Sequence, residues 1–499
     1  MLNPFATRLA WIRRVRPGKR RRSAALSAEP LEARVLLAAD TNSSFAVNRI
    51  TWNGEAVSVR TDSWIVRTAT GPAAMGIRSG WQTSSLGEGY FSLVAPGASP
   101  DDIRGWAAAT SAVRSVEPDR VVTASATLPN DPSFSRLWGL NNAGQTGGVS
   151  DADADAPEAW DVTTGSRSVV VAVVDTGIDT NHPDLAANIW RNPGETAGDG
   201  IDNDGNGFVD DVSGWNFVSN TPNVFDDNSH GTHVAGTIGA VGNNGVGVTG
   251  MNWQVSIMAL KFLNSSGSGT TSAAIAALNY ATMMRRTHGV NIVATNNSWG
   301  GGGPSVALRD TIAAGASAGI LCIAAAGNDR LDNDTNGSYP SNDLGTAGIA
   351  VAATDSSNRL ASFSNYGATT VHVGAPGVGI YSTTPNNAYA SYSGTSMATP
   401  HVTGLVALMA AANPQATAAQ IRSTILSTVT PVAGLAGKCS TGGVINAAAA
   451  VQAIRSVTPA PAPNPEPTPT PDPTPAAPPV RSEEHTSELQ SRVDISYAV

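Results

Sequence analysis

Cysteines, charged side chains and long apolar runs are all scarce in this chain of 499 residues. Cys322 and Cys439 are its two cysteines, which excludes a framework of several disulfide bridges and leaves one pairing open. Cys322 lies in an apolar run, where we expect it to behave as a small buried hydrophobic residue. Since no apolar run reaches the length of a transmembrane helix, we expect no integral membrane segment.

The low content of charged residues limits the kinds of protein that this chain could be. Charged residues make up 14% of the chain, against about a quarter in typical globular domains. The 51 glycines indicate many tight turns. A formal net charge of −9 argues against nucleic acid as a general partner. The length allows two or three domains.

The segment GTSMATPHVTGLVALMAAA, residues 394–412, is the most informative stretch. A Gly-Thr turn brings Ser396 to the start of an apolar helical pattern, where free backbone N–H groups and the helix dipole favour an alkoxide. Pro400 agrees with a helix start, because proline is tolerated in the first helical turn. Taken alone, the segment is equally compatible with an N-capping serine on a core helix.

Two further segments supply an acid and a base. In SVVVAVVDTGID, residues 168–179, the apolar run predicts a strand buried on both faces of a parallel sheet, with Asp175 at its carboxyl end. In NSHGTHVAGTIGA, residues 228–240, His230 precedes a helix of small residues. A neutral histidine could take the proton of Ser396, while Asp175 accepts the other imidazole N–H and stabilises the imidazolium.

Two other kinds of hydrolase share parts of this pattern. Asp-Thr-Gly at Asp175 also occurs in aspartic peptidases, but these need a second carboxylate, and no second Asp-Thr-Gly or Asp-Ser-Gly is present. His230 and His233 are spaced like zinc ligands, although the His-Glu-x-x-His pattern and an evident third ligand are missing. We expect His233 to be a buried, hydrogen-bonded structural residue and His401 to pack within its helix.

The segments DTGID, HGTHVAG and GTSMATPHV resemble the three signature blocks of subtilisin-like serine peptidases (subtilase, S8 family), in that family's order. ILCIAAAGN, residues 320–328, resembles the strand and turn that carry the family's oxyanion asparagine. The resemblance covers residues 130–454. It implies an α/β fold, three-layer α/β/α with a mainly parallel sheet. The catalytic residues that it implies are Asp175, His230, Ser396 and Asn328, the last holding the oxyanion together with a backbone N–H.

The same resemblance points to a peptide-binding edge at NNSWGGG, residues 296–302. Substrate would add there as an extended strand, so that main-chain hydrogen bonds give affinity and side pockets give selectivity. A roomy apolar pocket with no evident charge would favour cleavage after large apolar residues. The residues expected to bind substrate are Ser298, Trp299, Gly300, Ala325, Ala326 and Gly327.

Two loops are candidate calcium sites. GDGIDNDGNGFVDD, residues 198–211, resembles the oxygen-rich start of an EF-hand loop, with Ser213 in place of the final glutamate. Its clustered carboxylates repel unless a metal binds; a merely solvated loop is the alternative. The expected ligands in this loop are Asp202, Asp204, Asn206, Asp210 and Asp211. The family resemblance implies a second set: Asp131, Asp184, the side chain of Asn244, and the carbonyls of Gly242, Val246 and Val248.

The N-terminal third is expected to hold two segments. Residues 1–40 are rich in arginine, and EPLEARVLLAAD resembles a short motif of bacterial exported or surface proteins; a disordered basic arm is the alternative. Residues 41–127 alternate short strands with one helical candidate, SPDDIRGWAAATSAV, and their end resembles the close of an inhibitory subtilase propeptide. An unrelated accessory α+β domain is the alternative. Maturation would fall between Val122 and Asn130.

The C-terminal part changes composition abruptly after the peptidase domain, which we place at residues 128–457. Residues 458–480 form a Pro/Thr linker that cannot pack a core. Residues 481–499 include RSEEHTSELQS, which reads like a translated sequencing adapter, so we expect the natural C-terminus to be missing.

These features together predict a secreted or cell-surface serine endopeptidase, made as a zymogen and acting through an acyl-enzyme. Calcium is expected as a structural ion, with no cofactor for catalysis. The expected partners are protein and peptide substrates and the chain's own propeptide as an intramolecular inhibitor, with the enzyme a monomer. A catalytically silent surface-binding protein of the same fold is the alternative.

Overall fold

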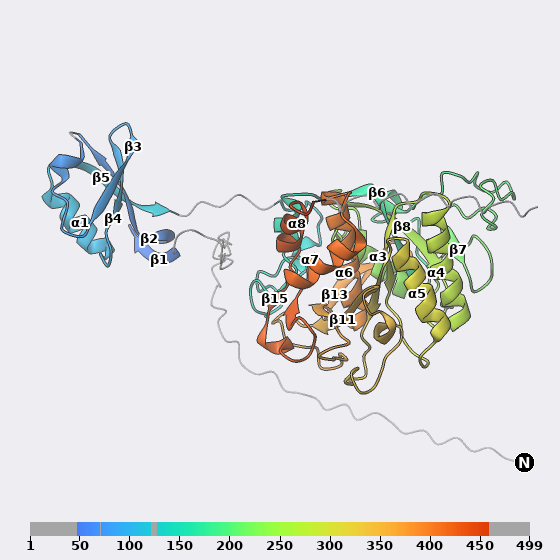
Figure 1. The fold of residues 1–499 in the computed structure, drawn as a ribbon. Coiled ribbons are helices and arrows are strands. Elements are labelled where there is room, and N and C mark those ends of the chain that lie inside the picture. Colours follow the sequence, from blue (N-terminus) through green and yellow to red (C-terminus); the bar gives the residue numbers. More distant parts are fainter. Residues whose placement is uncertain (1–46, 70, 121–126, 459–499) are drawn as a thin grey trace, which may run out of the picture. The chain divides into compact units, whose positions relative to one another are not determined.

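The computed structural model describes residues 47–69, 71–120 and 127–458, which form a small N-terminal unit and a larger unit (Figure 1). The predicted export segment 1–40, most of the predicted maturation region, almost all of the linker and the whole C-terminal tail lie outside the described residues.

The N-terminal unit is an antiparallel sheet with one helix. Its sheet runs in the order β1-β2-β4-β3, and β5 also pairs with β2. Helix α1 lies within the predicted helical segment and begins after Ser99, whose side chain and that of Asp102 form a capping box. The elements are β1 (Val47–Trp52), β2 (Glu55–Thr68), η1 (Pro72–Met75), β3 (Gln82–Gly87), β4 (Tyr90–Val94), α1 (Pro100–Ala109) and β5 (Val113–Arg120). Three tryptophans, Trp52, Trp64 and Trp106, are buried in its core.

The larger unit is built on a nine-stranded sheet in the order β15-β16-β12-β11-β10-β9-β6-β8-β7. All neighbouring strands are parallel except β15, which runs antiparallel to β16. The strands are β6 (Gly165–Asp175), β7 (Gly214–Asn216), β8 (Gln254–Lys261), β9 (Ile292–Asn297), β10 (Leu321–Ala325), β11 (Gly348–Thr354), β12 (Val373–Pro376), β15 (Thr430–Pro431) and β16 (Gly443–Val444). A separate hairpin pairs β13 (Ile380–Thr384) with β14 (Ala388–Tyr392).

Helices cover both faces of this sheet, which confirms the predicted three-layer α/β/α fold. On one face, α6 contacts β6, β9, β10, β11 and β12, and α3 packs beside it; on the other, α4 and α5 run side by side (Figure 1). The helices are α2 (Ala156–Trp160), α3 (His230–Gly239), α4 (Thr271–Arg286), α5 (Val306–Ser317), α6 (Thr395–Ala412), α7 (Ala418–Ser427) and α8 (Ala447–Ile454). Short 3-10 turns are η2 (Phe134–Arg136), η3 (Ala186–Asn188), η4 (Ser341–Asp343) and η5 (Ala433–Leu435).

Strand β6 explains why the sheet is buried on both sides. Its residues from Val169 to Asp175 are all buried, and successive side chains point to opposite faces. Val171 and Val173 belong to the core under α3 and α6, whereas Val170, Ala172 and Val174 belong to the core under α4 and α5. The unbroken apolar run is therefore the sequence signal of a central strand.

Both cysteines are buried and free, so the pairing of Cys322 with Cys439 does not form. Cys322 lies in β10 as a small apolar side chain, as predicted. Within the described residues, no helix has both the length and the apolar character needed to cross a membrane.

The close approach of α3 to the turn after β6 depends on Gly231. A Cβ at this position would stand 2.1 Å from the carbonyl oxygen of Gly177 and 3.2 Å from the Cβ of Asp175. A backbone oxygen and a Cβ atom cannot move without moving the main chain, so α3 and the turn after β6 would have to separate.

We therefore expect Gly231→Ala to lower the free energy of unfolding by about 1–3 kcal/mol, the usual effect of overpacking. Thermal melting of the variant measures the loss. Gly303→Ala is the matched control, because a Cβ there meets nothing within 4 Å. Equal melting of the two variants would contradict the proposed role of Gly231.

Candidate active site

Asp175 is the last residue of β6, and its carboxylate lies inside the protein with no exposed surface. Oδ1 accepts hydrogen bonds from the Thr176 backbone N–H at 2.7 Å and from Nδ1 of His230 at 2.8 Å. Oδ2 is buried without a partner. The carboxylate oxygen that faces the imidazole, Oδ1, is thus the one whose negative charge is stabilised by hydrogen bonds.

His230 is the first residue of α3, and 27% of its side chain is exposed. Burial lowers the pKa of His230, but the negative charge and hydrogen bond of Asp175, with the charge of Asp226, outweigh this and raise the pKa above its ordinary value. Since Asp175 accepts the Nδ1 proton, Nε2 is left to take up a proton from elsewhere.

Ser396 is the second residue of α6, near the predicted helix start. Its hydroxyl donates to the carbonyl of Ser298 at 2.9 Å, and within the described residues no hydrogen bond joins it to His230. A serine hydroxyl turns readily between acceptors.

Pro400 does not occupy the first helical turn, so that prediction was wrong: it lies inside α6, four residues after Ser396. An interior proline leaves the carbonyl of residue i−4 without its helical donor. That carbonyl belongs to Ser396, and the hydroxyl of Ser298 donates to it at 2.9 Å. Ser298 and Ser396 are therefore held together by two hydrogen bonds in opposite directions.

The parallel arrangement of β6 and β9 brings these groups to one edge of the sheet. Val173 of β6 is paired with Asn296 of β9, so Asp175 and Ser298 follow at matching places on neighbouring strands. Asp175 binds His230 and Ser298 binds Ser396, which places the three predicted catalytic residues along the carboxyl edge.

Asn328 follows β10 at the same edge. Its Oδ1 accepts from the backbone N–H and the hydroxyl of Thr395 at 2.8 and 3.0 Å, which leaves Nδ2 as the free donor end. A Cβ on Gly394 would lie 3.7 Å from this Nδ2 and 3.6 Å from the backbone nitrogen of Ser396. The Asn328 side-chain amide and the Ser396 backbone nitrogen therefore both lie close to Gly394.

A pocket of about 370 Å³ adjoins Ser396 and Asn328. Of the six residues predicted to bind substrate, Trp299, Gly300, Ala325 and Gly327 line it. Ser298 and Ala326 are buried beside it and do not. The rest of the lining is Gly301, Gly302, Asn328, Asp329, Leu331, Asn336, Gly337, Ser338, Tyr339, Asn365, Thr395 and Ser396. Contrary to expectation, the lining is rich in polar residues and includes the acidic residue Asp329.

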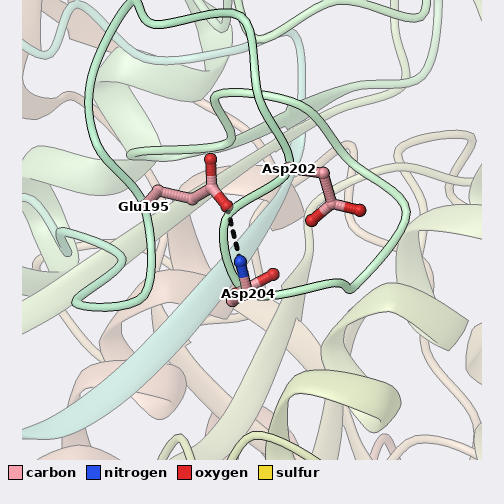
Figure 2. Close-up of side chains that lie close together, drawn as sticks. All are labelled: Glu195, Asp202 and Asp204. Atoms are coloured by element: carbon pink, nitrogen blue, oxygen red, sulfur yellow. Dashed lines mark hydrogen bonds between the residues drawn. The ribbon is translucent and has the colours of Figure 1, made fainter.

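Three carboxylates come together in the acidic loop, where their oxygens lie within 4.8 Å of one another (Figure 2). They belong to Glu195, Asp202 and Asp204, and Glu195 also accepts from the backbone N–H of Asp204 at 3.2 Å. Glu195 was missed by sequence reasoning, because it precedes the motif that drew attention to the loop. Such a set of hard oxygen donors suits Ca²⁺.

The other predicted ligands of this loop have different roles. Asp210 accepts from the backbone N–H groups of Gly198 and Gly200. Asp211 is fully buried and accepts from the side chains of Asn192, Asn206 and Tyr280. Burial raises the pKa of Asp211 although these donors oppose the shift.

The second predicted calcium loop is also drawn together. Asn244 donates through Nδ2 to Asp184 at 2.9 Å, and Asp131 accepts from the backbone N–H groups of Asn243 and Asn244. Burial raises the pKa of both Asp131 and Asp184. The Val248 N–H donates to Asp184 at 2.8 Å, and Val246 and Gly242 belong to the same loop.

Among the described residues, no other histidine joins His230 in a cluster that could hold a metal ion. His233 is buried, its Nε2 lies 3.0 and 3.1 Å from the carbonyls of Ile380 and Ala390, and burial lowers its pKa to about 4. His401 is equally buried, with Nδ1 2.9 Å from the carbonyl of Met397. Both lie as predicted, in the packing of their helices.

Comparison with known proteins agrees with this geometry. The sequence profile of the subtilase family matches residues 166–448, which is more than half of the chain. Thermitase of Thermoactinomyces vulgaris is 37% identical over 214 residues, 43% of this chain and 61% of thermitase. Subtilisin-like protease 1 of Plasmodium berghei (strain Anka) is 35% identical over 225 residues, 42% of this chain and 35% of that protein.

A solved structure, a protease from Pseudoalteromonas arctica PAMC 21717, superposes with a TM-score of 0.52 at 32% identity. The match covers 66% of this chain and the whole of that one. The chain spans only about a third of the length of the Plasmodium relative. From its four sequence segments, its parallel sheet and these matches, we conclude that the chain belongs to the subtilase family of subtilisin-like serine peptidases.

Proposed function

We propose that this protein is a serine endopeptidase in which Asp175, His230 and Ser396 hydrolyse peptide bonds through an acyl-enzyme. The observation that carries the proposal is the 2.8 Å hydrogen bond between buried Asp175 and His230. It holds the imidazole in the tautomer that leaves Nε2 free as a base and it raises the pKa of His230.

The reaction would begin when the Ser396 hydroxyl turns from Ser298 towards His230. Nε2 takes the proton as Oγ attacks the substrate carbonyl, and the proton then passes to the leaving amine as the C–N bond breaks. Water repeats the sequence on the acyl-serine and releases the second product. No cofactor is needed for these steps.

Asn328 and the Ser396 backbone N–H would stabilise the tetrahedral oxyanion. Support comes from the free Nδ2 of Asn328 and from the closeness of this amide and the Ser396 backbone nitrogen to Gly394. Donors held in place before the reaction lower the barrier, because they need no reorganisation when the charge develops.

Substrate would bind as an extended strand along residues 298–300, with a side chain in the pocket beside Trp299 and Gly300. Ser298 follows the last residue of β9, so its carbonyl is available to an incoming peptide once the Ser396 hydroxyl turns away. The partners proposed are thus proteins and peptides, and the enzyme would act as a monomer outside the cell or at its surface.

The N-terminal unit would be the propeptide, which inhibits the enzyme until it is cut off. The support is its compact α+β fold, with its own tryptophan-rich core, directly ahead of the peptidase domain. A separately folded unit can template and block the cleft and then be lost without unfolding the enzyme.

We propose structural calcium in both acidic loops. Glu195, Asp202 and Asp204 would hold one ion, and Asp131, Asp184 and Asn244, with backbone carbonyls of the same loop, a second. When bound, the ion would neutralise carboxylates that otherwise repel. The convergent oxygens of the first set support this assignment, as do the hydrogen bonds that hold Asp131 and Asp184 against residues 243–248 in the second.

Ser396→Ala tests the nucleophile. If the chain cuts its own propeptide, the variant should accumulate as the full precursor, show no peptidase activity and fail to react with a fluorophosphonate probe that labels the wild type. Gel analysis after expression in a protease-free host gives both readouts. Normal maturation there would contradict self-processing, and absence of labelling in the wild type would favour the catalytically silent alternative.

Asn328→Leu tests the oxyanion site. We expect kcat to fall by on the order of 10²–10³, the loss seen when subtilisin is deprived of its corresponding donor, with KM little changed. Steady-state kinetics separate the two constants. A loss confined to KM would mean that Asn328 binds only the ground state.

Calcium should stabilise the fold, by about 2.7 kcal/mol at a concentration one hundred times Kd. Melting curves of the full-length Ser396→Ala chain, with calcium or with chelator, measure the effect without autolysis. Asp202→Ala with Asp204→Ala should shrink the response and leave the part due to the second loop, whereas Asp310→Ala, at an exposed position of α5, should leave the response unchanged. Identical curves in both buffers would refute calcium at both loops.

A further inference from the structure

A second pocket, of about 280 Å³, lies beside the one described above and is basic. Its lining consists of Arg330, Leu360, Ala361, Ser362, Ser364, Tyr366 and Lys438, two cations with hydroxyl groups and no carboxylate. In a chain whose net charge is −9, two cations that share one cavity form an unusual electrostatic feature.

Neither cation has a carboxylate partner among the described residues. The guanidinium of Arg330 makes no hydrogen bond or ion pair there, and the Lys438 ammonium lies 3.9 Å from the centre of the Tyr366 ring. Asp334 accepts hydrogen bonds from the hydroxyls of Thr369 and Thr370, at 2.8 and 2.7 Å, and forms no ion pair with either cation. The positive charge of the pocket is therefore available to an outside anion.

The backbone of Arg330 supports a specific role for this side chain. Its φ of 58° is in the left-handed region, where a glycine would be accommodated more easily. The backbone N–H of Arg330 is nevertheless tied to the carbonyl of Phe363 at 2.9 Å. Non-glycine residues in this conformation cluster at functional sites.

The two pockets share one wall, formed by residues 329–331 and 364–366. Asp329, Leu331 and Asn365 line the first pocket, whereas the alternate residues Arg330, Ser364 and Tyr366 line the second. The wall is held by hydrogen bonds such as that from the Tyr366 N–H to the Leu331 carbonyl at 3.0 Å. Arg330 follows Asn328 by two residues, a span of about 7 Å at most.

We propose that the second pocket is a subsite for an acidic side chain of the peptide substrate, a few residues from the bond that is cut. The inference rests on the proposed peptidase function and names a substrate class for it. Arginine can meet a carboxylate through two parallel N–H donors, and Lys438 adds a second charge. Both cations are reached from solvent, so little desolvation opposes binding.

The test is a scan of internally quenched peptides with one fixed cleavage site. Asp is placed in turn at each of the four positions on either side of that site, and each peptide is compared with its Asn counterpart. We expect kcat/KM to favour Asp about fivefold at one or two positions at low salt, and the preference to fade at high salt.

Arg330→Gln, Lys438→Gln and the double variant should lose the Asp preference while cleaving neutral peptides normally. Arg330→Gly removes the same charge and relieves the left-handed backbone, which keeps the test valid if Arg330→Gln folds poorly. Arg359→Gln is the matched control, because Arg359 pairs with Asp355 at 2.8 Å and does not line the pocket.

Equal cleavage of Asp and Asn peptides by an active wild type would overturn the proposal, as would an Asp preference that persists in the double variant. Inorganic phosphate that binds at Arg330 without any Asp preference would mean a free-anion site and would also overturn it. If no peptide is cut, the proposed function fails, and binding of the Asp and Asn peptides to the same chain then decides the role of the pocket alone.

Discussion

The buried carboxylate of Asp175 is the constraint on which the rest of the site depends. An ionised carboxylate inside a protein costs several kcal/mol unless polar partners compensate it, on the order given by buried ion pairs. Here one oxygen has two donors and the other has none. Stabilisation of the buried carboxylate therefore depends on the hydrogen bond from His230. Because His230 is the first residue of α3, this bond also fixes the start of α3 against the end of β6. Gly231 permits this approach, because any Cβ there would strike the carbonyl of Gly177.

A second coupling joins Ser396, the proposed nucleophile, to the edge that would bind substrate. Pro400 leaves the Ser396 carbonyl without a helical partner, and the Ser298 hydroxyl fills the vacancy. The Ser396 hydroxyl in turn donates to the Ser298 carbonyl. An apparent defect of α6 thus fixes the helix start against the end of β9, so that a peptide lying on Ser298 would also lie against Ser396.

The surface of the larger unit separates its charges. Carboxylates gather in the loop at residues 195–211 and around Asp184, and Nδ1 of His288 lies 3.8 Å from the Asp204 carboxylate. Arg330 and Lys438 share a cavity that lacks acidic groups. Acidic groups are concentrated in the loops and basic groups in the cavity, which is the physical basis for proposing a cation at the loops and an anionic side chain in the cavity.

Much of the fold and of the site could be predicted from the sequence, because local patterns encode them. The valine run ending at Asp175 specifies a buried parallel strand, the Gly-Thr turn before Ser396 specifies a helix start, and Asn328 follows the apolar strand β10 in the expected segment. These features depend on neighbours in the chain.

Other features are decided only by tertiary structure, since they depend on residues far apart in the sequence. Glu195 joins Asp202 and Asp204 through loop folding that no motif announces. Pro400 is tolerated in the helix interior because the hydroxyl of Ser298, just after β9, donates to the Ser396 carbonyl in place of the N–H that proline lacks. Arg330 and Lys438, more than one hundred residues apart, meet only when the chain has folded, because a pocket is formed by packing and not by sequence spacing.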